Sequence, residues 1–308
     1  MKKILIFICF ISLMLVPASA LAWGSATHSY FAKKLGKNNG YINLQEMYGA
    51  VVPDMFNLMF GHPYRNYLWT QTHYEFMKLV DVAKIGIGKA FAYGFASHNE
   101  KWGADYTAHI CAVLNPGEGY VVAKTNMLAP LLEPKITEFL IANGIPYTPE
   151  LVQELSLAFA DSSVESAIDL LVSQNEDKQV GAQMALAAQL RNLFVPFLLA
   201  KAYAQDLAQQ PDMTNYQATS LIFNAEKQFR EYIKSYGIML TKDERIDLMA
   251  QQGAQLAQER LEKEYEISVV VPPGLMKESL LAATGIVKYD YSLELTATLN
   301  YLKTQLKN

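Results

Sequence analysis

The sequence predicts an all-α protein, a multi-helix bundle with additional helices toward the C-terminal end. Apolar residues recur at helical spacing in five long segments. Turns rich in glycine and proline separate these segments, and no stretch alternates polar and apolar residues for long enough to indicate a sheet. The five segments are 121–143, 149–173, 179–208, 214–236 and 241–264.

Local signals refine these segments. Thr241 and Glu244 have the spacing of a capping box, which predicts the start of the last helix at this point. The apolar stretch 182–200 contains Arg191 and Pro196, so it indicates a buried helix rather than a membrane span. Residues 267–271 are strand-like but short and isolated.

One glycine-rich segment resembles half of a dinucleotide-binding fingerprint. Gly86-Ile87-Gly88 lacks a preceding strand and a third glycine in place, so we interpret it as the start of a helix. The sequence contains neither a nucleophile elbow nor a P-loop.

The first 22 residues have the pattern of a secretory signal peptide. Lys2 and Lys3 supply the positive charge, residues 4–15 the apolar run, and Ala20-Leu21-Ala22 the small-residue cleavage site. We therefore expect cleavage after Ala22 and export to the periplasm or beyond. The new N-terminus would be Trp23, whose free amine has a pKa of roughly 8 and could bind a metal together with its carbonyl oxygen.

The composition limits the class of protein. Cleavage would remove Cys9 and leave Cys111 as the only cysteine, so stability must come from the core or from metals rather than from a disulfide. The formal net charge of −4 makes binding to a nucleic-acid backbone by charge alone improbable. We expect two parts after the signal peptide, a helical core over 23–175 and a helical extension over 176–308 that packs on it.

Histidines gather in the first third of the mature chain, with carboxylates near them. Asp105 and His109 are four residues apart, so on a helix they share one face. Nitrogen and oxygen donors without cysteine are typical of a catalytic rather than a structural zinc site. The candidate ligands of this kind are His28, Asp54, His73, His98, Asp105 and His109, whereas His62, before Pro63, is interpreted as a loop residue.

In order along the chain, these motifs resemble the zinc-dependent phospholipase C and P1/S1 nuclease superfamily, and most closely its bacterial exported phospholipase C-like branch. The resemblance covers roughly residues 23–170. It rests on Trp23-Gly24 with His28, Pro53-Asp54, Thr72-His73, and Gly94-Phe95-Ala96-Ser97-His98 followed by Asp105 and His109. It implies an all-α fold with up to three clustered Zn²⁺ ions and an N-terminal tryptophan as a ligand.

The resemblance also implies which residues bind each ion. One ion would take the amine and carbonyl of Trp23, the imidazole of His28 and one oxygen of Asp105. A second would take the other oxygen of that bridging carboxylate, with ligands from Asp54, His73 and His98. A third would take His109, Asp161 and Glu165, with Asp169 as the alternative to the last two.

The chain departs from the family pattern in two places. No histidine follows His109, so Asp161 would replace the usual histidine of the third site. His98 and Asp105 are seven residues apart instead of four, as if Glu100-Lys101-Trp102 had been inserted. Seven residues of ideal helix separate Cα atoms by about 10.5 Å, so we expect the helix to bulge or break, with Gly103 a convenient place; otherwise the site is altered.

The implied activity is hydrolysis of a phosphodiester, with a phospholipid as the leading substrate and transient contact with a membrane surface. A metal-bound hydroxide would attack phosphorus in line, and Asp54 would orient or deprotonate the water. No stable nucleic-acid partner is expected. The alternatives are a P1/S1-type nuclease that prefers single strands and a non-catalytic exported binding protein with a degenerate metal site.

Structural explanations also exist for these residues. Asp54 follows a proline and could cap a helix, His73 could be a hydrogen-bonded core histidine, and Asp161 and Glu165 could form the polar face of a helix.

Overall fold

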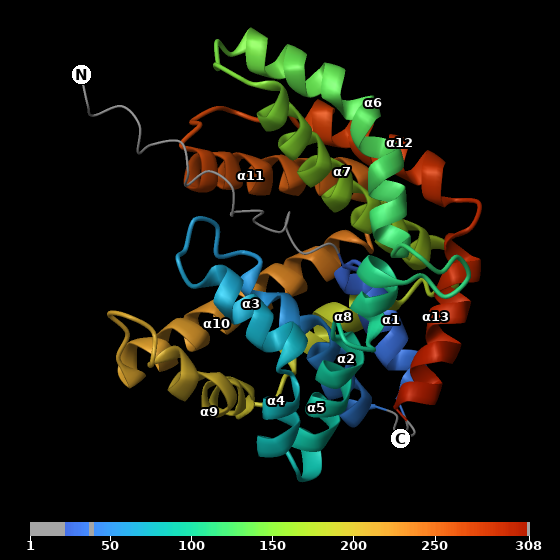
Figure 1. Cartoon of the computed structure of the whole chain (residues 1–308). Helices are drawn as coiled ribbons and strands as arrows, with labels where there is room; N and C mark the ends of the chain where they lie inside the picture. Colours follow the sequence, from blue (N-terminus) through green and yellow to red (C-terminus); the bar gives the residue numbers. More distant parts are fainter. Residues whose placement is uncertain (1–21, 37–39, 307–308) are drawn as a thin grey trace.

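The computed structural model describes residues 22–36 and 40–306, and within these ranges the chain is all-α, without a strand (Figure 1). The signal-peptide prediction for residues 1–21 lies outside the described residues. The N-terminal helices are α1 (Ser25–Leu35), α2 (Tyr41–Val51), the 3₁₀ turn η1 (Val52–Phe56), α3 (Arg65–Tyr74), α4 (Met77–Val82), α5 (Gly86–His98) and the π-helical turn η2 (Tyr106–Ile110).

The remaining helices include the longest of the described chain. In order, the remaining helices are α6 (Tyr120–Ala142), α7 (Pro149–Leu171), the π-helical turn η3 (Val172–Glu176), α8 (Val180–Gln189), α9 (Val195–Leu207), α10 (Asn215–Met239), α11 (Arg245–Tyr265), α12 (Pro273–Val287) and α13 (Tyr291–Gln305). The longest are α6, α7, α10 and α11.

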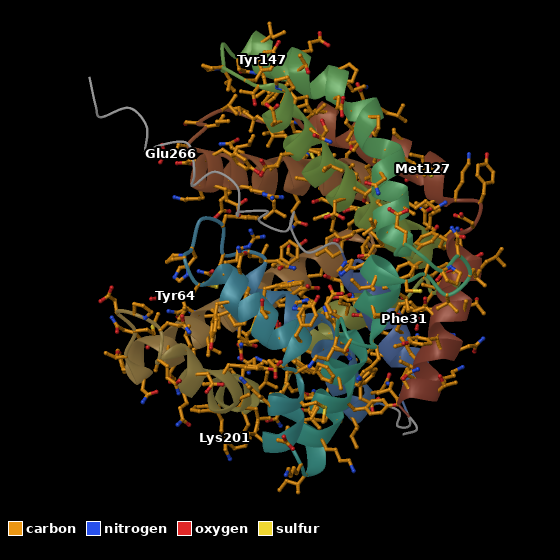
Figure 2. The ribbon with its side chains drawn as sticks, in the orientation of Figure 1. Phe31, Tyr64, Met127, Tyr147, Lys201 and Glu266 are labelled. Atoms are coloured by element: carbon orange, nitrogen blue, oxygen red, sulfur yellow. The ribbon has the colours of Figure 1, made fainter. Side chains whose placement is uncertain are left out.

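The helices form two groups that lie one above the other in Figure 1. The upper group contains α6, α7, α11 and α12, and the lower group contains α1 to α5 and α8 to α10, while α13 packs beside α1. One cluster of buried apolar side chains runs through both groups. Figure 2 marks Phe31 within this core and the exposed Met127 and Tyr147 on the outer side of the upper group.

Three of the five expected helices are confirmed with small changes at their ends, namely α6, α7 and α10, and α5 begins at Gly86 as expected. Pro149 lies in the first turn of α7, and Thr148 caps that helix by accepting the amide of Leu151. Thr214 forms a capping box with Gln217 at the start of α10.

The expected helix 179–208 is wrong as a single element, because the chain turns between α8 and α9. Gln45 of α2 accepts the backbone amide of Asn192 at 2.8 Å and donates to the carbonyl of Leu190 at 3.0 Å, so the turn is tied to the core. Arg191, in this turn, forms an ion pair with Glu226 at 2.6 Å.

The capping box predicted at Thr241 is also wrong. The hydroxyl of Thr241 donates back to the carbonyl of Ile238, and α11 begins only at Arg245, so Glu244 precedes the helix without a side-chain cap. The strand-like residues 267–271 form an extended connection between α11 and α12 rather than a strand. None of the described helices has the length and apolar character needed to cross a membrane.

Candidate metal centre

The centre is built where α2 and α5 cross. Glycines make the crossing close, because a Cβ atom on Gly94 would lie 2.7 Å from the carbonyl carbon of Glu46 and 3.0 Å from the amide nitrogen of Ala50. One turn further along α5, His98 places its Nδ1 atom 2.7 Å from the carbonyl oxygen of Ala50. The glycine therefore sets the helix spacing at which this hydrogen bond forms.

Two imidazoles face one another with their Nδ1 atoms committed to backbone carbonyls. Nδ1 of His98 donates to Ala50, and Nδ1 of His73 donates to the carbonyl of Trp69 at 2.9 Å, since a carbonyl can only accept. Each Nε2 atom then presents a lone pair, and the two Nε2 atoms are 3.2 Å apart in a fully buried position. Two lone pairs at this distance require a proton or a metal cation between them.

Two carboxylates complete this group. Asp105 has an oxygen 2.8 Å from Nε2 of His98 and 3.4 Å from Nε2 of His73. Asp54, in η1, has an oxygen 3.4 Å from Nε2 of His73 and 3.6 Å from Nε2 of His98. The four residues offer one ligand atom each, and these atoms all lie within 4.8 Å of one another. The donor set of two imidazoles and two carboxylates suits a divalent transition ion.

Neighbouring residues fix the positions of the Asp54 and His73 side chains. The Thr72 hydroxyl donates to the carbonyl of Pro53 at 2.9 Å, which ties α3 to η1 next to the carboxylate. The side chain of Asn57 donates to Asp54 at 2.9 Å. The ring of Trp69 stacks on the imidazole of His73 at 4.5 Å between centroids and covers its outer face.

The seven-residue spacing between His98 and Asp105 does not separate these ligands, because the helix breaks between them. α5 ends at His98, and the side chain of Asn99 accepts the amides of Lys101 and Trp102 at 2.8 and 2.9 Å. A Cβ atom on Gly103 would lie 2.5 Å from the carbonyl carbon of His98, so this glycine permits the close return of the chain. The expected break is confirmed; it begins at Asn99, and the tight turn closes at Gly103.

A third imidazole lies on the other oxygen of Asp105. Nε2 of His28, on α1, is 3.0 Å from this oxygen, and its ring stacks on that of His98 at 4.0 Å between centroids. Asp105 thus contacts three histidines with its two oxygens, as the bridging role implies.

The N-terminus of α1, and with it His28, is held by Asp169 of α7. The buried Asp169 carboxylate accepts the amides of Ala26 and Thr27 at 2.9 and 2.8 Å, and the hydroxyls of Thr27 and Tyr236 at 2.7 and 3.1 Å. Burial raises the pKa of Asp169 to about 6, and these hydrogen bonds oppose that shift. Asp169 therefore acts as a helix cap supplied by another helix, and the alternative role as a metal ligand finds no support in its contacts.

Trp23 is anchored by its side chain. The fully buried indole donates to the carbonyl of Ala104 and the hydroxyl of Thr107, both at 3.0 Å, and stacks on Tyr120. In the described chain Ala22 precedes it, and the Ala22 amide donates to Glu165 at 2.7 Å. Ligation by a free amine of Trp23 depends on cleavage and stays a prediction.

The residues expected at the third ion are only partly brought together. His109, on η2, contacts Glu100, and these two form a second group of potential ligands with Asp105, whose ligand atoms lie within 4.8 Å of one another. Asp161 is close enough to His109 for their charges to interact, and to Glu165 likewise. Among the described residues, neither Asp161 nor Glu165 belongs to a group of three converging ligands.

Burial and mutual charge shift the acid–base properties of the centre. Burial alone would raise the pKa of Asp105, but the charges and hydrogen bonds of His98 and His28 hold it well below its usual range. Burial alone would lower the pKa of His98, but Asp105 and Asp54 raise it well above its ordinary value. Burial and the charge of His98 lower the pKa of His28. The centre thus combines ionised carboxylates with one bound proton, as expected of a site for a cation.

The acids of α7 behave differently. Burial raises the pKa of Asp161 to about 8, although His109 and Arg260 lower it in part. Burial and the charge of Asp161 raise the pKa of Glu165 well above its usual range. Both acids line a pocket of about 200 Å³ between α7, α10, α11 and α12. Asn57, the partner of Asp54, also lines this pocket, which therefore reaches the edge of the metal centre.

Sequence reasoning missed Glu100, because it treated residues 100–102 as an insertion that disturbs the site. The signal was present in the residue type, since a glutamate two residues after His98 offers an oxygen donor, as the nearby aspartates do. In comparisons with known proteins, no family model, no curated protein and no solved structure matches the chain, so the resemblance to the phospholipase C and P1/S1 nuclease superfamily rests on the residues of this sequence alone.

Proposed function

We propose that this protein is an exported, metal-dependent phosphodiester hydrolase of the phospholipase C type. The observation that carries the proposal is the pair of Nε2 atoms of His73 and His98, 3.2 Å apart, both with Nδ1 bound to a carbonyl. Asp54 and Asp105 add two carboxylates to this pair. When bound, divalent cations bind phosphate oxygens as Lewis acids and lower the pKa of a coordinated water toward neutrality.

The protein's own residues supply the remaining parts of the reaction. Asp54 is the most exposed of the four potential ligands, with 8% of its surface exposed, and Asn57, which donates a hydrogen bond to it, lines the pocket. Its carboxylate is therefore placed to orient the attacking water and to accept the proton that the water loses. His28 and His98 are buried and hold Asp105 in position, so they exclude water from the far side of the centre.

The adjoining pocket supports a substrate with an anionic and an apolar part. Arg65 and Arg260 line it, and both pair with Glu264, at 2.6 and 2.7 Å. Apolar side chains also line the pocket, among them Phe159 and Met276. A guanidinium is suited to a phosphate, and these apolar side chains suit the non-polar part of a lipid analogue.

The proposal is tested by hydrolysis of three substrates with the metal-loaded protein: a chromogenic phosphodiester, a phosphatidylcholine analogue and denatured DNA. We expect cleavage of the first two. His73→Ala should abolish it, whereas the matched control His62→Ala, in the loop before α3 and outside the metal centre, should retain it. Cleavage of DNA alone would favour the nuclease, and binding of metal without hydrolysis of any of the three would favour a non-catalytic binding protein.

Export is part of the same proposal. Cleavage after Ala22 would remove the residue whose amide binds Glu165 and would leave Trp23 with a free amine. Mass spectrometry of the protein recovered from the periplasm and from the medium should give a chain that begins at Trp23. A chain that retains the first 22 residues would contradict this part of the proposal.

A further inference from the structure

The turn that interrupts the helix between His98 and Asp105, from Asn99 to Gly103, brings an additional carboxylate into the protein interior. The amide of Glu100 donates to the carbonyl of His73 at 3.1 Å, which fixes the turn against α3. The side chain of Glu100 then points inward, with 1% of its surface exposed, although Lys101 beside it is half exposed. A glutamate in such a position is rare unless a partner neutralises it.

The partners of this carboxylate are other potential ligands. Its Oε1 atom contacts Nδ1 of His109, and the ligand atoms of Glu100, Asp105 and His109 lie within 4.8 Å of one another. Oε2 of Glu100 and Nε2 of His109 are buried without a hydrogen-bond partner, whereas the Asp105 oxygens already contact His98 and His28. An unsatisfied buried carboxylate oxygen is costly, and one that belongs to a group of three potential ligands favours an ion at this place.

The charge of this group matches a divalent cation. Two ionised carboxylates with a neutral imidazole carry two negative charges, and oxygen and nitrogen donors in this ratio suit Zn²⁺ or Mn²⁺. Asp105 is the one residue shared with the first centre. A carboxylate shared by two ions holds them about 3.5–4 Å apart in two-metal sites.

We propose that Glu100, Asp105 and His109 bind a second divalent ion, so that Asp105 bridges a two-ion centre in which Glu100 takes the place of a ligand from α7. This inference deepens the proposed function and rests on it for the first ion, at Asp54, His73 and His98. It differs from the expected third site, because Asp161 and Glu165 remain with the pocket rather than with the ion.

Metal content measured by elemental analysis tests the proposal. When purified with zinc, the Glu100→Gln variant should hold one ion fewer per chain than the wild type. Glu259 is an exposed glutamate of α11, and the control variant Glu259→Gln should hold the wild-type number. With Mn²⁺, the wild type should give the electron paramagnetic resonance signal of a spin-coupled pair, and Glu100→Gln that of an isolated ion. An unchanged zinc count in Glu100→Gln would overturn the proposal.

A measurement on the unaltered chain keeps the test independent of folding of the variant. Crystals of the wild type grown with zinc and measured at the zinc absorption edge should show an anomalous peak between Glu100, Asp105 and His109. A peak between His109, Asp161 and Glu165 instead, or a single peak at His73 and His98, would overturn it. Two ions in place without phosphodiester hydrolysis would refute the proposed function and leave this inference standing.

Discussion

The close crossing of α2 and α5 predicts that a single methyl group, remote from any ligand atom, weakens the metal centre. In Gly94→Ala the new Cβ atom would lie 2.7 Å from the carbonyl carbon of Glu46. Carbon atoms in contact need about 3.5–4.0 Å, so the helices must separate by about 1 Å. The distance from Nδ1 of His98 to the Ala50 oxygen would rise from 2.7 Å to roughly 3.7 Å, where a hydrogen bond no longer forms.

Two measurable effects follow. Overpacking costs about 1–3 kcal/mol and the lost hydrogen bond about 1 kcal/mol, against a gain of about 1 kcal/mol for alanine over glycine in a helix. We therefore expect Gly94→Ala to lower the free energy of unfolding by about 1–3 kcal/mol in urea titrations. Loss of the hydrogen bond that orients a ligand weakens metal binding 10–100-fold in known sites, and we expect a similar change in the zinc dissociation constant here.

The matched control is Gly285→Ala in α12, where an added Cβ atom meets nothing within 4 Å. It should leave zinc affinity unchanged and raise stability by up to about 1 kcal/mol. Equal zinc affinity in Gly94→Ala and Gly285→Ala, by competition with a chromogenic chelator, would refute the reasoning that the helix spacing orients His98.

Three further predictions concern the same centre. Asp169→Ala leaves two buried amides at the start of α1 without an acceptor. The free energy of unfolding, from thermal and urea denaturation, should therefore fall by about 2–4 kcal/mol. The control Asp247→Ala removes a surface ion pair with Lys277 and should change that free energy by less than about 0.5 kcal/mol. Removal of zinc by a chelator should lower the free energy of unfolding by about 2.7 kcal/mol, relative to protein at a free zinc concentration 100 times the dissociation constant. If the wild type shows no such difference, or if a His98→Ala variant shows it too, His98 is not a zinc ligand. The pKa of His98 is raised well above 6.5, so zinc must displace a proton from this imidazole when it binds. Zinc affinity should therefore rise about tenfold per pH unit below that pKa, and calorimetry in buffers of different ionisation enthalpy should detect the released proton. A zinc affinity that is independent of pH between 6 and 7 would contradict this coupling.

Long helices were predictable because each buries one continuous apolar face. α6, α7 and α10 show this pattern over more than twenty residues each. The break between α8 and α9 was not predictable from periodicity, since it depends on Gln45, far away in the sequence, which binds both sides of the turn. The false capping box at Thr241 shows the same limit, because its hydroxyl found a backbone acceptor in the preceding helix.

The site shows a similar division. Residue types and order were enough to select Asp54, His73, His98 and Asp105, which the fold brings within reach of one ion. The position of Glu100 depends on the path of a turn, which is set by the side chain of Asn99 and the carbonyl of His73. Helical spacing does not predict the path of such a turn. For this reason the extra residues were expected to disturb the site, whereas in the structure they bring a further carboxylate to it.

The contribution of the C-terminal part lies in its contacts with the site. Glu294 of α13 accepts the amides of Val113 and Leu114 at 2.5 and 3.0 Å, just after the π-helical turn that carries His109. The hydroxyl of Thr298 donates to that of Thr107 in the same turn, at 3.1 Å. The expected division of the chain at residue 175 stays a prediction, but residues on both sides of it share one core and support one site.

The depth of the histidine and aspartate ligands has a consequence for kinetics. The side chains of His28, His73, His98 and Asp105 have at most 1% of their surface exposed. A chelator can approach an ion among them only from the side of Asp54, where the pocket begins, and it cannot surround the ion until the helices that carry the buried ligands move apart. The rate at which metal is stripped should therefore become independent of chelator concentration, and that limiting rate would measure how often this part of the protein opens.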